Sequence, residues 1–413
     1  MLRFLTGGES HGESLVAILD GMPAGLALSR AAIDGQLRRR QLGYGRGRRM
    51  ALEADQVEIL SGVRRGLTLG TPIALRIRNR DWVNWQWTMS VEAEPPASAA
   101  GARRADLTRP RPGHADLAGA LKYGHADLRN VLERASARET AARVAVGACV
   151  AVLLETAGIR IASHVVSLGP VRLPDEVGRG FEAIAALADD DAIPCLDAAC
   201  RDRMVAAIDA AREAGDTLGG SFEVVARGVP AGLGSYAQWD RRLDGRLAQA
   251  LMSIPAIKAV EIGEGVASAS RPGSAVHDAI LPAADPRQPE RLSRPTNRAG
   301  GVEGGVSNGE DVRITAYMKP IPTLMTPLPS VDLRTGLDAP ASIERSDTCA
   351  LPAAAVVGEA VTAIVLADAL LETFGGDTVT DLVRGLEAWR GARRLQFAPR
   401  SDSGGARGGS AER

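Results

Sequence analysis

A long apolar segment near the end of the chain limits most strongly what this sequence can fold into. Residues 353–374 are rich in Ala, Val and Leu, yet they include Glu359, Asp368 and Glu372. Carboxylates are costly in a lipid-facing span, so we expect a helix buried in a protein core and not a membrane anchor. With 413 residues, of which 45% are hydrophobic, the chain is long enough to enclose such a helix.

Strand and helix patterns alternate along the rest of the chain. Apolar residues at every second position predict half-buried strands near residues 73–77 and 312–316. Ala- and Leu-rich stretches followed by glycine predict helices at 129–156, 201–214 and 353–374. There is no βαβ rhythm and no internal repeat, so we predict an α+β fold or a layered α/β fold.

Charge and composition exclude several classes of protein. The net charge is −1 and aromatic residues make up 3%, which argues against a nucleic-acid-binding module. The first residues lack a long apolar signal region, so we expect a cytoplasmic protein with no membrane partner. The cysteines lack C-x-x-C spacing and are expected to be free, mostly buried thiols rather than zinc ligands or disulfides. They are Cys149, Cys195, Cys200 and Cys349.

The organisation predicted from these patterns is one domain over residues 1–395 with a disordered, low-complexity tail at 396–413. Residues 79–112 are rich in Pro, Ala and Trp and lack periodicity, so we expect a long surface excursion. Three tryptophans within six residues of this segment suit either an oligomer contact or a lid, and both interpretations stay open. They are Trp82, Trp85 and Trp87.

A glycine-rich turn at residues 7–14 follows the first apolar run. It is close to a phosphate-binding P-loop, but Glu13 stands where that motif needs lysine, and its carboxylate would repel phosphate. What remains is a turn that presents His11, whose side chain exchanges protons near neutral pH. A loop histidine can equally be structural, and the local sequence leaves both roles open.

Six arginines lie between residues 38 and 49 without an acid among them. Ser29 is expected to cap the N-terminus of a helix that ends before Gly43. The arginines after Gly43 would then lie on a glycine-rich loop. Guanidinium groups bind phosphate and carboxylate in bidentate fashion, so the run suits a ligand with several negative charges. A solvated basic face or a nonspecific nucleic-acid patch is the alternative.

Other polar motifs are ambiguous one by one. Two G-H-A-D tetrads contain His114 and His125, but no third and fourth ligand lies nearby, so we expect no metal site. Residues 133–140 suit either an anion site or an ordinary charged helix face. The glycine-rich segment 296–305 and the K-P-I-P-T segment at 319–323 indicate tight turns or a close approach of backbone to a ligand.

Seven motifs in this order and spacing resemble the chorismate synthase family, over residues 1 to about 389. They are GESHG, RRRQLGYGRGRR, RPGHAD, KYGHADLRNVLERASARET, NRAGGVEGGVSNG, KPIPT and RSDTCALPA. The resemblance implies a layered β-α-β sandwich with helices between the sheets, assembled as a homotetramer. It also implies a lyase of the shikimate pathway that converts 5-enolpyruvylshikimate 3-phosphate to chorismate by 1,4-elimination of phosphate.

The cofactor implied by the resemblance is reduced flavin mononucleotide (FMN), which is needed although no net oxidation occurs. NADPH would enter only indirectly, as the source of reduction, through an external flavin reductase. No G-x-G-x-x-G motif follows a strand, so a nicotinamide-dependent oxidoreductase is the unsupported alternative.

The resemblance also assigns roles to residues. His11 would protonate the reduced flavin, His114 would assist the departing phosphate, and Asp347 would act with flavin N5 in removing the ring proton. The arginines implied to bind the substrate are Arg40, Arg46, Arg49, Arg109 and Arg138. The residues implied to contact flavin are Arg134, Ala135, Ser136, Pro255, Ala256, Gly304, Lys319, Pro320, Ile321, Pro322, Thr323 and Arg345. Proline cannot donate a hydrogen bond, so Pro255 departs from the polar amide residue common in this family.

Overall fold

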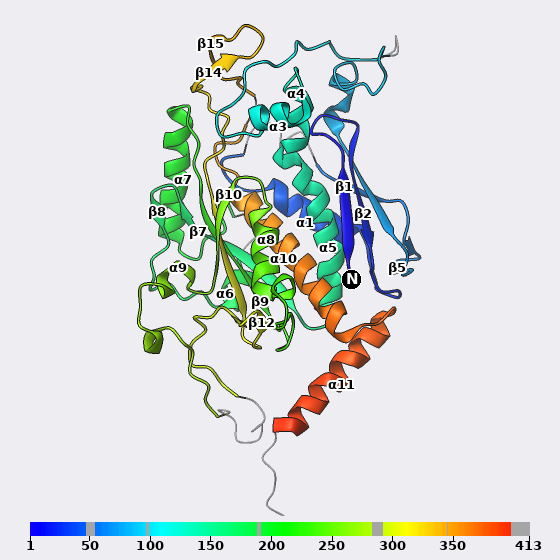
Figure 1. Ribbon diagram of the computed structural model, residues 1–413, viewed down its shortest axis with the longest axis vertical. Helices are drawn as coiled ribbons and strands as arrows, with labels where there is room; N and C mark the ends of the chain where they lie inside the picture. Colours follow the sequence, from blue (N-terminus) through cyan, green and yellow to red (C-terminus); the bar gives the residue numbers. More distant parts are fainter. Residues whose placement is uncertain (47–53, 96–98, 188–190, 283–291, 345, 398–413) are drawn as a thin grey trace, which may run out of the picture.

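A layer of helices lies between two antiparallel β-sheets (Figure 1). The structure is a computed structural model, which describes residues 1–46, 54–95, 99–187, 191–282, 292–344 and 346–397. For residues 393–397 it describes the backbone only. The first sheet has the strand order β1 (Arg3–Gly7), β2 (Ser14–Asp20), β6 (Ile73–Arg78) and β3 (Val57–Ile59). The second has the order β10 (Ile257–Ile262), β13 (Val312–Met318), β9 (Gly220–Arg227), β7 (Arg160–Leu168) and β8 (Val171–Arg172). The helices between them are α1 (Arg30–Gln41), α5 (Thr140–Thr156), α8 (Leu243–Met252) and α10 (Leu351–Phe374). The predicted α+β class with helices between sheets is confirmed.

Smaller elements surround these layers. The other helices are α3 (Asp116–Tyr123), α4 (Arg129–Ala135), α6 (Phe181–Ala185), α7 (Ala198–Glu213), α9 (Gly265–Ser268) and α11 (Val379–Phe397). Short 3-10 helices occur at η1 (Arg80–Asn84), η2 (Ala137–Glu139), η3 (Trp239–Arg241) and η4 (Gly273–Ala275). Three two-stranded hairpins pair β4 (Val63–Arg64) with β5 (Leu67–Thr68), β11 (Val302–Glu303) with β12 (Val306–Ser307), and β14 (Pro329–Asp332) with β15 (Leu337–Pro340).

The two sheets differ in how much of each face is covered. Along β2, buried and exposed side chains alternate, because one face packs on the helices and the other faces outward. Along β9, six consecutive residues are buried, since α10 packs on one face and α6 lies against the other. Exposed apolar side chains remain on the outward part of the first sheet, with Leu5 76% and Ile18 49% exposed.

Most predicted elements are confirmed, with one correction. The strands near 73–77 and 312–316 are β6 and β13, the Ser29 hydroxyl caps α1 by accepting from the Ala32 N–H at 3.2 Å, and the helix at 201–214 is α7. The single helix predicted over 129–156 is wrong, because the chain turns to an extended conformation at Ser136 between α4 and η2. The Ser136 hydroxyl accepts from the Arg138 N–H and so starts a new helical segment. The four cysteines are free and buried, as predicted.

The centre of the helical layer is the contact between α5 and α10 (Figure 1). By length and composition α10 could cross a membrane, but 89% of its most apolar window is buried inside the protein, so it is a core helix. The prediction of a buried helix is confirmed. A Cβ added at Gly147 of α5 would lie 2.4 Å from the Ala360 Cβ and 2.6 Å from its Cα, so glycine permits the two backbones to approach.

Gly147→Ala is expected to lower the free energy of unfolding by about 1–3 kcal/mol, because the added methyl group overlaps the α10 backbone. Gly35→Ala in α1 is the matched control, since no described atom lies within 4 Å of its added Cβ. The control should be neutral or raise the free energy of unfolding by about 0.5–1 kcal/mol through helix propensity. Urea unfolding followed by circular dichroism measures both. Equal effects of the two substitutions would contradict the close-packing account.

Candidate active site

His11 lies in the turn between β1 and β2, as the sequence predicts. Gly8 in this turn has a φ of +99°, and a Cβ there would lie 2.3 Å from the Ser14 carbonyl oxygen, so the turn requires glycine. Glu133 of α4 accepts a hydrogen bond from the His11 backbone N–H at 2.9 Å. Both oxygens of the same carboxylate lie 2.9 Å from His11 Nδ1. The backbone and the ring of His11 are therefore held by one buried acid.

Glu133 was not recognised from the sequence, where it belongs to a charged stretch that also suits an exposed helix face. Burial by itself would raise the pKa of Glu133, but the hydrogen bonds and charge of His11 and the charge of Arg129 outweigh burial and lower this pKa. Glu133 is therefore an anion at neutral pH. Its ion pair with Arg129 four residues earlier, at 3.3 Å, is the one sequence signal that could have been noticed.

Asp55 is the centre of a buried network of ion pairs. Arg138 Nη1 donates to the two Asp55 carboxylate oxygens at 2.7 and 2.6 Å, and Arg40 Nη2 donates to one of them at 3.1 Å. Arg138 Nε and Nη2 also donate to the Asn79 side-chain oxygen, at 3.1 and 2.9 Å. The Asn79 amide donates to the Gly12 carbonyl oxygen and so connects this network to the His11 turn. Two predicted arginines, Arg40 and Arg138, are thus brought together beside His11.

Arg40 carries positive charge in an unusually dry environment. Burial lowers the pKa of Arg40 to about 10, Asp55 opposes this change, and the neighbouring charges of Arg138 and Arg46 add to it. The Nε atoms of Arg40 and Arg46 are buried and have no hydrogen-bond partner among the described residues. Buried donors are normally satisfied, so these two N–H groups indicate a place for an anionic ligand.

Asp347 joins the same network through Arg46, whose Nη1 lies 2.8 Å from the Asp347 carboxylate. The Gly45 carbonyl oxygen accepts from the Thr348 N–H at 2.8 Å, which holds the arginine-rich loop against the segment before α10. Two further predicted residues, Arg49 and Arg345, lie outside the described residues.

His114 belongs to a second cluster, together with Arg111 and Asp116. His114 Nδ1 lies 2.5 Å from one Asp116 carboxylate oxygen, and Arg111 Nε donates to the other at 2.8 Å. Burial by itself would raise the pKa of Asp116, but the hydrogen bonds from His114 and Arg111 and their charges hold this pKa well below its usual range. Arg111 Nη1 also donates to the Thr323 hydroxyl at 2.8 Å, which attaches the predicted 319–323 segment to His114.

Lys319 strengthens this attachment and carries a second indication of an anion. Its Nζ donates to the Gly113 carbonyl oxygen at 2.6 Å, and its backbone N–H donates to the Ala256 carbonyl oxygen at 2.9 Å. Burial and the neighbouring charge of Lys258 lower the pKa of Lys319. Among the described residues no carboxylate forms an ion pair with Lys319. Ala256 has a φ of +69°, a left-handed conformation that is uncommon for alanine and typical of functional sites.

The remaining predicted residues lie in different parts of the structure. Arg134 donates to the Thr6 and Gly8 carbonyl oxygens, at 3.0 and 3.1 Å, so it secures the end of β1. The Ser136 hydroxyl lies 3.2 Å from the hydroxyl of Ser10, the residue before His11. Ala135, between Arg134 and Ser136 in the chain, is half-buried. Pro255, Pro320, Ile321 and Pro322 flank Ala256 and Lys319 in the chain.

Among the described residues, two predicted residues form no hydrogen bond or ion pair with these clusters. Arg109 is exposed, and its charge acts on Asp332 of β14. Gly304 is in the turn between β11 and β12, next to Gly305, whose carbonyl oxygen accepts from the first N–H of α8. Ala256 follows the other end of α8, a helix of ten residues and so about 15 Å long. The fold therefore separates Gly304 from the other predicted flavin contacts of the same chain.

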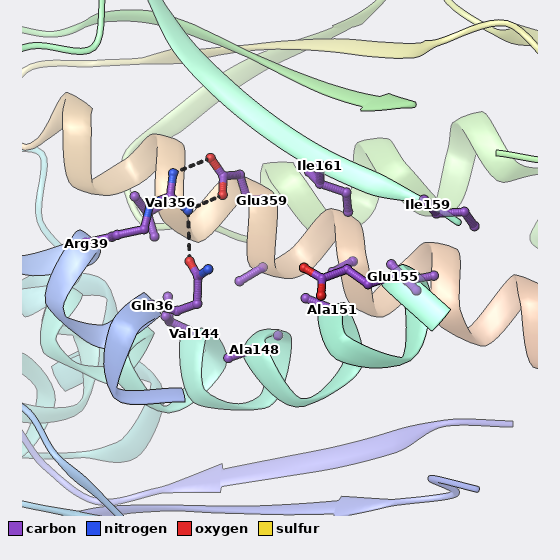
Figure 2. A pocket seen from close by; sticks show the side chains of 14 residues that line it. Gln36, Arg39, Val144, Ala148, Ala151, Glu155, Ile159, Ile161, Val356 and Glu359 are labelled. Carbon is purple, nitrogen blue, oxygen red and sulfur yellow. Dashed lines mark hydrogen bonds and ion pairs between the residues drawn. The ribbon is translucent and has the colours of Figure 1, made fainter. Parts of the chain in front are cut away.

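Two cavities among the described residues do not coincide with these clusters. Figure 2 shows one of about 80 Å³ between α1, α5 and α10, where Arg39 forms a bidentate ion pair with Glu359. A second, of about 330 Å³, shares Arg39 and opens toward α6. The lining is mostly apolar in the first, and Arg39 is already paired. The histidine and arginine clusters, where buried donors lack partners, are therefore the candidate active site. The described residues hold no group of three His, Cys, Asp or Glu that suits a metal ion.

The lowered pKa of Asp116 predicts a pH-dependent effect of Asp116→Asn. The folded carboxyl binds its proton more weakly than the unfolded one, so its contribution to stability is full above the ordinary carboxyl range and is lost as the pH falls below it. The difference in free energy of unfolding between wild type and variant should therefore stay constant above about pH 5 and narrow as the pH falls below about pH 4. Urea unfolding at several pH values measures it. If the difference in free energy of unfolding did not change as the pH fell, the lowered pKa of Asp116 would be contradicted.

Comparison with known proteins identifies the family to which the chain is similar. The chorismate synthase family model matches residues 2–371. A chorismate synthase of Moorella thermoacetica is 60% identical over 390 residues, covering 94% of this chain and 98% of that protein, and one of Beutenbergia cavernae is 55% identical with the same coverage. A crystal structure of chorismate synthase is 43% identical, covers 95% of this chain and 98% of that chain, and superposes with a TM-score of 0.75. The chain belongs to the chorismate synthase family.

Proposed function

We propose that this chain catalyses the 1,4-elimination of phosphate and a ring proton from 5-enolpyruvylshikimate 3-phosphate, which gives chorismate, the last common intermediate on the way to the aromatic amino acids. One C–O bond and one C–H bond break and one C=C bond forms, so the reaction is that of a lyase without net redox change. Family membership and the names of the relatives support this reaction.

The observation that carries the proposal is the pair of buried Nε donors on Arg40 and Arg46. The substrate bears one phosphate and two carboxylates, so it offers anionic oxygens to both. Asp55, itself held by Arg138, pairs with Arg40, and Asp347 pairs with Arg46. We expect Arg49 and Arg109 to add further positive charge, as the family resemblance implies.

Proton transfer is assigned to two histidines and one carboxylate. His11 and His114 each have Nδ1 against a buried acid, which fixes the orientation of the ring for proton transfer. In this proposal His114 donates a proton to the departing phosphate and His11 donates one at the flavin. Asp347, oriented by Arg46, takes part in removing the ring proton.

Reduced FMN is the cofactor we propose, and the residues near Lys319 fit it. The ammonium groups of Lys319 and Lys258 repel each other, and a phosphate between them would relieve this repulsion. Ala256 is hydrogen-bonded to Lys319, and we propose that it and the backbone of residues 319–323 contact the ring system, together with Ser136 beside the His11 turn. When bound, the reduced flavin supplies electron density transiently to the substrate, which lets phosphate leave without net oxidation.

The wider context is part of the same proposal. We expect reduced FMN from an external flavin reductase that uses NADPH, in a cytoplasmic homotetramer whose catalytic unit is residues 1–395. The exposed apolar side chains of Leu5, Val16 and Ile18 on the first sheet support assembly, since such patches mark contact surfaces. Turnover by highly purified protein with oxidised FMN and NADPH would contradict the external reductase.

An anaerobic assay tests the function directly. With chemically reduced FMN and 5-enolpyruvylshikimate 3-phosphate, the purified protein should release chorismate and inorganic phosphate in equal amounts. Chorismate is followed by its absorbance and phosphate by a coupled assay. Omission of the flavin is the control and should abolish both products. Release of phosphate without chorismate would indicate a phosphatase and would exclude the proposed elimination.

His114→Ala is expected to reduce kcat by about a hundredfold or more, because general acid catalysis typically contributes that much. His125→Ala is the matched control, since it removes the histidine of the other G-H-A-D tetrad, which lies outside the clusters described above. The control should keep kcat within about twofold of wild type, because no contact among the described residues joins the half-buried His125 to those clusters. Loss of less than about tenfold in His114→Ala would contradict its role as the leaving-group acid.

A further inference from the structure

Trp85 is a buried tryptophan whose surroundings are polar. Its side chain is 4% exposed, yet it belongs to none of the hydrophobic clusters formed by the described residues. Its indole Nε1 donates to the Asp81 carboxylate at 2.8 Å. The guanidinium groups of Arg104 and Arg129 lie over the ring, 3.7 and 5.4 Å from its centroid. Burial of apolar area alone therefore does not account for this residue.

The ring of Trp85 lies directly on His11. The two ring centroids are 3.7 Å apart and the planes differ by 21°, which is a stacked arrangement. Glu133 already holds Nδ1 of the same imidazole at 2.9 Å. A hydrogen bond at Nδ1 alone would leave the imidazole free to rotate about that contact. A flat ring stacked on the imidazole also fixes the plane of the imidazole. Glu133 and Trp85 together thus set the direction in which Nε2 of His11 points.

Residues 80–84 form η1, which begins directly after Asn79, and Trp85 ends this turn by donating its N–H to the Trp82 carbonyl oxygen at 2.9 Å. Asn79 is hydrogen-bonded to Arg138 and to the Gly12 carbonyl oxygen, so the turn starts from the active-site network itself. The segment that carries Trp85 is consequently anchored at the site and brings the indole over the His11 turn.

We propose that Trp85 is a positioning residue for His11: the indole holds the imidazole in the plane from which it transfers its proton and keeps water from that face of the ring. This inference rests on the proposed role of His11 as a proton donor. It assigns a function to one tryptophan of the 82–87 group, and it predicts that Trp85 acts through His11 and not through substrate binding.

Kinetics of three variants test the proposal. Trp85→Leu should lower kcat by roughly tenfold to a hundredfold, the cost of a misplaced catalytic group, with KM for 5-enolpyruvylshikimate 3-phosphate within about twofold. Trp85→Phe keeps a flat ring and should recover most of kcat. Trp87→Leu, the same change two residues away, should keep wild-type kcat. A rise in KM with unchanged kcat in Trp85→Leu would overturn the proposal.

A double-mutant cycle shows whether Trp85 acts through His11. In a His11→Ala background, Trp85→Leu should change the residual rate by less than about twofold, because the group it positions is absent. An equal loss in both backgrounds would refute the inference and leave the role of His11 intact. Full activity of His11→Ala alone would instead refute the proposed role of His11, so the two failures are distinguishable.

An activity-independent measurement reports the stack itself. In protein labelled with ¹³C-histidine, the ring signals of His11, assigned by their loss in His11→Ala, should be displaced upfield by the indole ring current. Trp85→Leu should abolish the displacement, whereas Trp87→Leu should preserve it. Unfolding by urea verifies that each variant is folded. His11 signals that do not respond to Trp85→Leu would show that the rings are not stacked in solution and would overturn the proposal.

Discussion

The close contact between α5 and α10 is the constraint on which the rest of the structure depends. Gly147 lets the two backbones approach at Ala360, and the sheets pack on either side of this pair. The active-site segments are attached to the same two helices, since Arg138 directly precedes α5 and Asp347 precedes α10. A change in the helix crossing would therefore move the arginines proposed to bind the substrate relative to the proposed proton acceptor.

The candidate site beside these two helices consists of positively charged side chains, each of which forms an ion pair with a nearby carboxylate. Asp55 serves Arg40 and Arg138, Asp347 serves Arg46, and Glu133 serves His11. The net contribution of a buried ion pair to stability is small. Removal of one partner nevertheless lowers the free energy of unfolding strongly, because the other charge is left buried and unpaired. Among the described residues of this network, the Nε donors of Arg40 and Arg46 lack partners, which suits the anionic groups of the proposed substrate.

Particular residues show how far sequence patterns carry and why they stop. The cap at Ser29 depends on a neighbour in the chain, so a local pattern predicted it. The break at Ser136 is also local, but a serine inside an Ala- and Leu-rich stretch is compatible with an uninterrupted helix. Glu133 resembled an ordinary surface acid because its partner, His11, is 122 positions away in the chain.

The sequence by itself determined the family, the buried core helix and the chemical types of the site, because motifs, hydrophobicity and side-chain chemistry are properties of the chain alone. Only the tertiary structure decided which charges meet. It selected Asp55 as the partner of two arginines, separated Gly304 from Ala256 by the length of α8, and laid Trp85 on His11. Electrostatic and stacking interactions act over a few ångströms, and contacts between residues so distant in sequence exist only after the layers have packed.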